Sequence, residues 1–81
     1  MMNLHNIPTS MQSHFEQTQE VLGGKLRVRG TRVSVEQILE LLEAGLGAVE
    51  ITRSFPSLTQ SDVSAVERLA AHCALLIFQP A

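Results

Sequence analysis

The chain has 81 residues, a formal net charge of −2 and a single cysteine. This length allows one small domain, and one cysteine excludes an internal disulfide. The negative charge excludes proteins that hold nucleic acid by a bulk positive field, because such binding needs many phosphate contacts. Small domains often gain stability by oligomerising, so we expect a homodimer.

The first 18 residues mix polar side chains with isolated apolar ones and keep no helical or strand period. We therefore expect residues 1–18 to be a flexible N-terminal arm and residues 19–81 to be a single domain. The arm shows no basic and apolar leader typical of export, which favours a cytoplasmic protein. His5 and His14 lack cysteine or carboxylate neighbours at ligand spacing, so no metal site and no cofactor are expected.

Residues 23–35 differ from their surroundings, because they hold four of the six basic residues of the chain. After two glycines, residues 25–29 alternate basic and apolar side chains, which predicts a half-buried strand with Leu26 and Val28 facing inward. Residues 32–35 either pair back on this strand or run straight into a helix. A two-stranded ribbon is marginal alone, so it must pack on helices or on another chain.

Ser34 with Gln37 three residues later predicts the start of a first helix, and Gly45 is placed to end it. Residues 48–54 form a second, short helix, in which Val49 and Ile51 are expected to be buried.

A third helix is expected to begin near Gln60, because Thr59 and Asp62 resemble a capping box. Its apolar stripe predicts a helix that runs to about Phe78. Residues 73–78 are apolar all round, yet too few to span a membrane, so they favour a protein interface. Cys73 fits a small buried apolar group better than a reactive thiol. The candidate interface residues are Cys73, Leu75, Leu76, Ile77 and Phe78.

The order of four short motifs resembles a known family. These motifs are Gly-Gly-Lys at 23–25, Arg-Gly-Thr-Arg-Val at 29–33, Leu-Leu-Glu-Ala-Gly at 41–45 and Phe-Pro-Ser-Leu-Thr at 55–59. Together they resemble the domain-of-unknown-function 433 family, small bacterial proteins regarded as antitoxin-like, over about residues 20–71. Two positions depart from the family pattern: Leu26 replaces a common proline, and Glu67 to Ala70 lack an aromatic residue often found there.

The resemblance implies a mainly α fold, a three-helix homeodomain-like helix-turn-helix bundle with a short N-terminal β-ribbon. Residues 48–54 would be the positioning helix, 55–58 the turn and 60–72 the recognition helix. The implied function is an antitoxin-like binding module that dimerises, binds a small PIN-like nuclease toxin and binds operator DNA. The alternatives are a stand-alone helix-turn-helix transcriptional regulator and a purely structural protein-interaction domain.

Double-stranded DNA has two sets of candidate contacts in this sequence. Recognition helices present their N-terminal residues to bases in the major groove, while cations contact phosphates. The candidate DNA-binding residues are Lys25, Arg27, Arg29, Arg32, Gln60, Ser61, Ser64 and Arg68. Arg27 and Arg29 fit a solvated strand face equally well. Arg32 fits an ion pair with Glu36 better than a phosphate contact.

A catalytic function is not expected, and no catalytic residue is proposed. General acid–base chemistry needs carboxylates or histidines placed together in a cleft, whereas the acidic residues here are spread over helix surfaces. The Gly-Gly-Lys sequence lacks the remaining spacing of a phosphate-binding loop.

Overall fold

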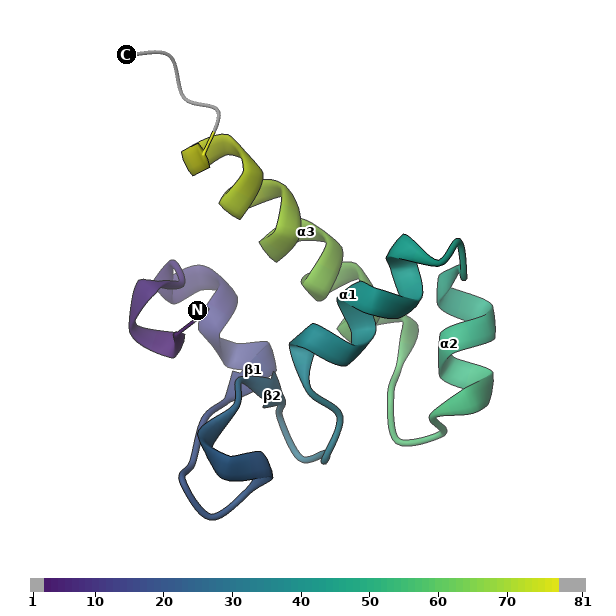
Figure 1. Cartoon of the computed structure of the whole chain (residues 1–81), viewed down its shortest axis with the longest axis horizontal. Helices are drawn as coiled ribbons and strands as arrows, with labels where there is room; N and C mark the ends of the chain where they lie inside the picture. The colour runs from purple at the N-terminus through teal and green to yellow at the C-terminus, as the bar shows by residue number, and fades with distance from the viewer. Residues whose placement is uncertain (1–2, 78–81) are drawn as a thin grey trace.

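The structure, a computed structural model, describes residues 3–77 and the side chains of residues 3–73. It is mainly helical, with a two-stranded antiparallel sheet beside three α-helices (Figure 1). The α-helices are α1 (Val35–Glu43), α2 (Ala48–Ser54) and α3 (Gln60–Ile77). The strands are β1 (Phe15–Glu16) and β2 (Arg27–Val28), and three short 3-10 helices are η1 (Leu4–Asn6), η2 (Thr9–His14) and η3 (Leu22–Gly24). The predicted fold class is confirmed at this level.

The ends of α1 follow from local hydrogen bonding, as the sequence predicts. Oγ of Ser34 accepts the backbone N–H of Gln37 at 3.0 Å, which satisfies one of the unpaired donors of the first turn. At the other end Gly45 has φ of 97°, a left-handed conformation that a residue with a side chain rarely adopts. The backbone N–H of Leu46 then bonds to the carbonyl of Leu41 at 3.1 Å, which closes the helix.

Helix α2 begins and ends where the sequence predicts, and α3 begins at Gln60 as predicted. The predicted end of α3 at about Phe78 lies outside the described residues. α2 starts after Gly47 and ends at Ser54, and residues 55–59 connect it to α3. The prediction for Val49 is wrong, since its side chain is 52% exposed while Ile51 is fully buried. α2 is only seven residues long, so it turns one narrow stripe to the core, and Val49 lies outside that stripe.

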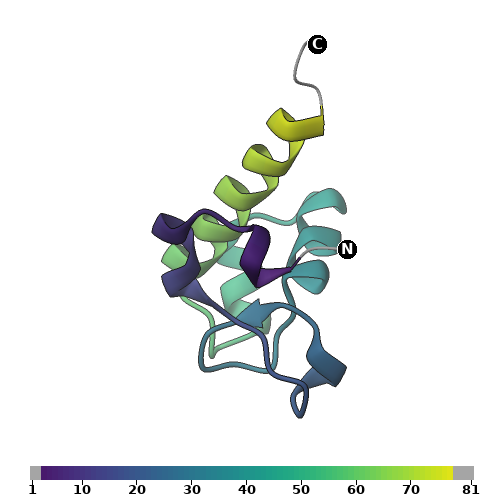
Figure 2. The same cartoon turned by 90° about the vertical axis from the view of Figure 1, so that its left-hand side faces the viewer.

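The core lies where α3 meets α1, α2 and the N-terminal segment. Val63, Val66 and Leu69 supply its α3 side, and each is at most 1% exposed. In both views α3 passes between α1 and the N-terminal segment, and its last turns extend beyond the other elements (Figures 1 and 2). None of the helices within residues 3–77 is both long and apolar enough to cross a membrane.

The N-terminal segment differs from the predicted flexible arm. Phe15 is fully buried and Ile7 is 4% exposed, so both belong to the core. η2 packs directly against α3, and β1 continues from η2 into the sheet. The polar composition of residues 3–18 hid this docking, because two large apolar side chains are enough to anchor a short segment but too few to give a period.

The ribbon has a second partner that was not predicted. Residues 33–35 pair back briefly on β2 as expected, through an antiparallel bridge between Ser34 and Arg27. On its other side β2 pairs with β1, with Phe15 opposite Val28 and Glu16 opposite Arg27. The inward orientation of Leu26 and Val28 is confirmed, at 5% and 1% exposure. Pairing with residues 15–16 buries the ring of Phe15 under the sheet, and residues 32–34 offer no aromatic group of comparable apolar area.

We predict that Phe15→Ala lowers the free energy of unfolding by about 3–5 kcal/mol, because it removes a fully buried aromatic ring. Urea unfolding followed by circular dichroism measures this loss. The control is Val49→Ala at an exposed position, where a change within about 0.5 kcal/mol is expected. Equal effects of the two substitutions would show that the N-terminal segment does not pack on the core and would favour the flexible arm instead.

Candidate nucleic-acid interface

The first half of α3 presents a polar face to solvent. Gln60, Ser61, Ser64 and Arg68 are all exposed, while Val63, Val66 and Leu69 on the opposite side are buried. Ser61, Ser64 and Arg68 follow one another at spacings of three and four, so they lie on one side of the helix. The structure therefore brings these four predicted residues together on one accessible surface.

The first turn of α3 is fixed by a reciprocal cap. The backbone N–H of Asp62 donates to Oγ1 of Thr59 at 3.1 Å, and the backbone N–H of Thr59 donates to Oδ2 of Asp62 at 2.9 Å. The other carboxylate oxygen of Asp62 lies 3.7 Å from Nδ1 of His14 in η2. The Asp62 side chain is only 20% exposed, so the carboxylate is turned to the cap and to η2, away from the exposed face.

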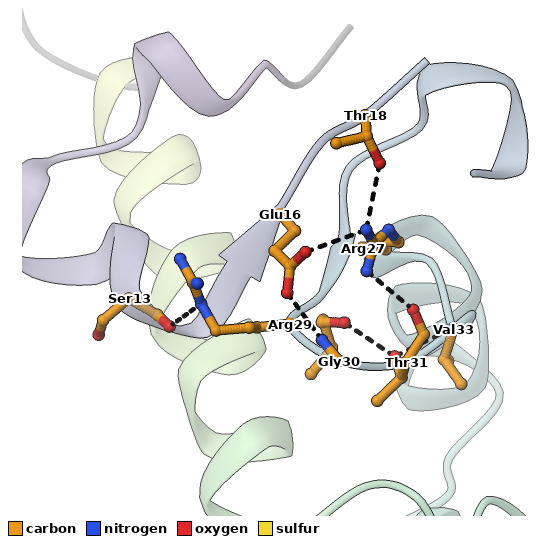
Figure 3. A network of polar contacts seen from close by, with 9 residues as sticks. Ser13, Glu16, Thr18, Arg27, Arg29, Gly30, Thr31 and Val33 are labelled. Carbon is orange, nitrogen blue, oxygen red and sulfur yellow. Dashed lines mark hydrogen bonds and ion pairs between the residues drawn. The ribbon is translucent and has the colours of Figure 1, made fainter. Parts of the chain in front are cut away.

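Arg27 is not an exposed cation, so its prediction as part of a solvated strand face is wrong, and its bonds within the chain do not favour the predicted DNA contact. The residue is 7% exposed, and Nη2 donates to Oε2 of Glu16 at 3.0 Å and to Oγ1 of Thr18 at 3.1 Å (Figure 3). Nη1 donates to the carbonyl of Thr31 at 3.1 Å, whereas Nε is buried without a partner among the described residues. The strand period placed Arg27 outward, but the N-terminal segment covers that side of β2 and supplies the carboxylate.

The Gly30-Thr31 turn is held by the same carboxylate. Oε1 of Glu16 accepts the backbone N–H of Gly30 at 2.9 Å, so one side chain bonds both to Arg27 and to the turn (Figure 3). Gly30 has φ of 77°, the left-handed region that favours glycine. Thr31 closes the turn internally, because its Oγ1 donates to the carbonyl of Val28 and accepts the N–H of Val33. The turn of the family motif is thus a rigid structural element.

Two further residues that were predicted to contact DNA, Lys25 and Arg32, lie apart from the exposed residues of α3. Glu36 pairs with Lys25, whose Nζ lies 3.9 Å from Oε2, so the predicted pair between Arg32 and Glu36 is wrong. Both partners are more than half exposed, and such a pair contributes little to stability. Arg32 is exposed and makes no ion pair with any carboxylate in the described part of the chain. Lys25 has its neighbour on α1, away from the exposed residues of α3.

Arg29 and Arg68 both border η2. Nε of Arg29 donates to the carbonyl of Ser13 at 2.9 Å, and the residue is exposed. Arg68 lines a shallow depression of about 340 Å³ between η2 and α3, together with Ser10, Met11, His14 and Ala65. The positions of Ser10, Met11 and His14 were not predicted, because no local pattern in residues 9–14 indicates that they pack on a helix that begins 46 positions after His14.

The candidate interface at the end of α3 lies mostly outside the described side chains. Cys73 is partly buried and packs against the core. The side chains of Leu75, Leu76 and Ile77, and residue Phe78 as a whole, fall outside the described part. In residues 3–77, no three His, Cys, Asp or Glu side chains gather as metal ligands would.

These features define a small helical domain whose last helix exposes polar side chains along its first half. The family model of proteins of unknown function DUF433 matches residues 16–70, more than half of the chain. The protein therefore belongs to the DUF433 family. Comparisons with curated proteins and with solved structures gave no match. The matched region begins at Glu16, so η1 and η2 lie before it.

We predict that Arg27→Met lowers the free energy of unfolding by about 2–4 kcal/mol, because it breaks a largely buried ion pair and frees the carbonyl of Thr31. Thermal and urea unfolding at neutral pH measure this loss. Lys25→Met is the matched control, with the same charge change at an exposed pair and an expected cost below about 1 kcal/mol. Equal costs would show that the buried pair does not support the fold.

Proposed function

We propose that this protein is an antitoxin-like binding module that forms a homodimer, binds operator DNA through α2, residues 55–59 and α3, and binds a small PIN-like nuclease toxin. In this proposal the chain is a homeodomain-like helix-turn-helix domain that acts in the cytoplasm and catalyses no reaction. α2 would be the positioning helix, and α3 would be the recognition helix that enters the major groove.

One observation supports DNA binding above all. Gln60, Ser61 and Ser64 are exposed at the start of α3, directly after a short connection from α2, while the opposite face of the helix is locked into the core. Glutamine pairs well with adenine, and serine bonds to several base edges. The rigid attachment of α3 favours recognition, since base contacts require fixed side-chain positions.

The net charge of the chain favours a dimer as the form that binds DNA. One copy with a net charge of −2 offers few phosphate contacts, and a dimer doubles them while it joins two half-sites. The extended end of α3 favours such an interface, because the last turn of the helix continues beyond the other elements and residues 74–77 have the sequence Ala-Leu-Leu-Ile (Figure 1). An apolar helix segment in solution normally packs against another chain.

The same helix end is the proposed site for a toxin partner. If a dimer leaves part of the apolar end of α3 free, a partner with an apolar groove fits there by burial of the helix. A stand-alone transcriptional regulator remains the second candidate, favoured by the same exposed face of α3 and in need of no toxin.

We predict that Gln60→Ala weakens binding to the preferred duplex by about 5-fold to 100-fold, as expected for the loss of one good base contact. Fluorescence anisotropy with duplexes that tile the DNA upstream of its own gene identifies the preferred site and measures the loss. Gln37→Ala on the exposed face of α1 is the matched control and should leave the affinity unchanged. Absence of any preferred duplex would overturn the DNA-binding part.

We predict that Leu76→Glu converts the dimer to a monomer, because a carboxylate in an apolar interface loses its hydration without a partner. Light scattering after size-exclusion chromatography measures the mass in solution. Ala71→Glu adds the same charge at an exposed position of α3 and should leave the dimer intact. A wild-type protein that is monomeric at all concentrations would contradict the proposed dimer.

The toxin part has its own test. Co-expression with the product of a neighbouring nuclease-like gene should give a complex that survives co-purification. A solitary gene with no nuclease-like neighbour, or a neighbour that does not bind, would leave the stand-alone regulator as the function.

A further inference from the structure

We propose that the N-terminal segment is part of the DNA-binding surface: Arg29 and Arg68, which both border η2, contact the phosphodiester backbone of duplex DNA. This inference rests on the proposed function and adds a second element to it. It concerns residues that precede the matched family region as well as residues within it.

The segment has a fixed position against α3. The buried ring of Phe15 and the pairing of β1 with β2 anchor it at one end. His14 is held twice, because its carbonyl accepts the backbone N–H of Arg29 at 2.8 Å and its ring lies 3.7 Å from the carboxylate of Asp62 in the first turn of α3. The surface formed by η2 and α3 is therefore continuous at the start of the proposed recognition helix.

The charge distribution singles out two arginines at this surface. Within residues 3–77, Lys25 is paired with Glu36 and Arg27 with Glu16, whereas the other arginines have no carboxylate partner and are exposed: Arg29, Arg32, Arg53 and Arg68. Of these four, Arg29 and Arg68 are the ones with a contact to η2 described above. The nearest acidic group of the first turn, Asp62, is occupied by the Thr59 cap and by His14. The two guanidinium groups thus keep their charge available for an anion.

The geometry of Arg29 favours a phosphate. Its Nε bond to the carbonyl of Ser13 fixes the guanidinium group and leaves both terminal nitrogens without a partner in the described structure (Figure 3). A guanidinium held in this way loses less conformational freedom when it forms a paired contact with phosphate oxygens. Arg68 lies on the same side of α3 as Ser61 and Ser64. Phosphate contacts beside a recognition helix fix its register in the groove.

The test is the salt dependence of duplex binding by Arg29→Met and Arg68→Met. For each arginine that contacts a phosphate, the slope of log affinity against log salt falls by about 0.9 between about 50 and 200 mM salt. The loss should be equal for preferred and scrambled duplexes, whereas a base contact affects only the preferred one. Lys25→Met removes the same charge from an exposed pair on α1 and should leave the slope unchanged.

Three results would overturn the inference. The first is an unchanged slope in both arginine variants, and the second is an equal fall in slope with Lys25→Met, which would indicate bulk charge rather than a local contact. The third is absence of duplex binding by the wild type, which would overturn the proposed DNA binding as well. Arg68→Met keeps the test decisive if Arg29→Met does not fold, because Arg68 makes no side-chain hydrogen bond in the described part of the chain.

Discussion

The contact between Arg27 and Glu16 ties together three parts of the chain. Through its two carboxylate oxygens Glu16 bonds to Arg27 on β2 and to the backbone of Gly30, and Arg27 bonds onward to the carbonyl of Thr31. A buried pair of this kind gives a small net gain in stability, because desolvation of both charges offsets most of their attraction, and the unpartnered Nε adds to that cost. The main consequence of the pair is geometric. The hydrogen bonds of Glu16 and Arg27 form together only when β1, β2 and the Gly30-Thr31 turn are arranged as they are here.

That arrangement determines how the N-terminal segment meets α3. With β1 paired to β2, the preceding η2 lies beside α3, and the buried side chains of Ile7 and Phe15 complete the core there. α3 consequently has one face in contact with α1, α2 and η2 and one face open to solvent. In a chain of 81 residues with a modest core, one long helix thus stabilises the fold and also exposes a polar face.

The sequence predicted what local chemistry determines. The caps at Ser34 and Thr59, the end of α1 at Gly45 and the bounds of α2 are set by residues three or four positions apart, so a reading along the chain finds them. The exposed candidates Gln60, Ser61, Ser64 and Arg68 followed from the same helical period.

Apart from the exposure of Val49 on α2, the errors concern contacts between different segments. Arg27 was expected to be solvated, but its carboxylate comes from Glu16, which lies 11 residues earlier in a segment without any period. The role of His14 depends on Asp62, 48 positions later. Lys25 rather than Arg32 reaches Glu36, because the rigid Gly30-Thr31 turn sets where each side chain of the ribbon can extend.

The proposed DNA-binding surface joins fold and function, because residues 9–14, Arg29 and the exposed face of α3 would contact the duplex together. Titration of the isotope-labelled protein with its preferred duplex, followed residue by residue by nuclear magnetic resonance, is the decisive experiment. We expect the signals of η2, of Arg29 and of Gln60 to Arg68 to shift together, while those of Glu36, Glu40 and Glu43 on α1 stay in place. Shifts confined to α1, or a spectrum that the duplex leaves unchanged, would contradict the proposed surface.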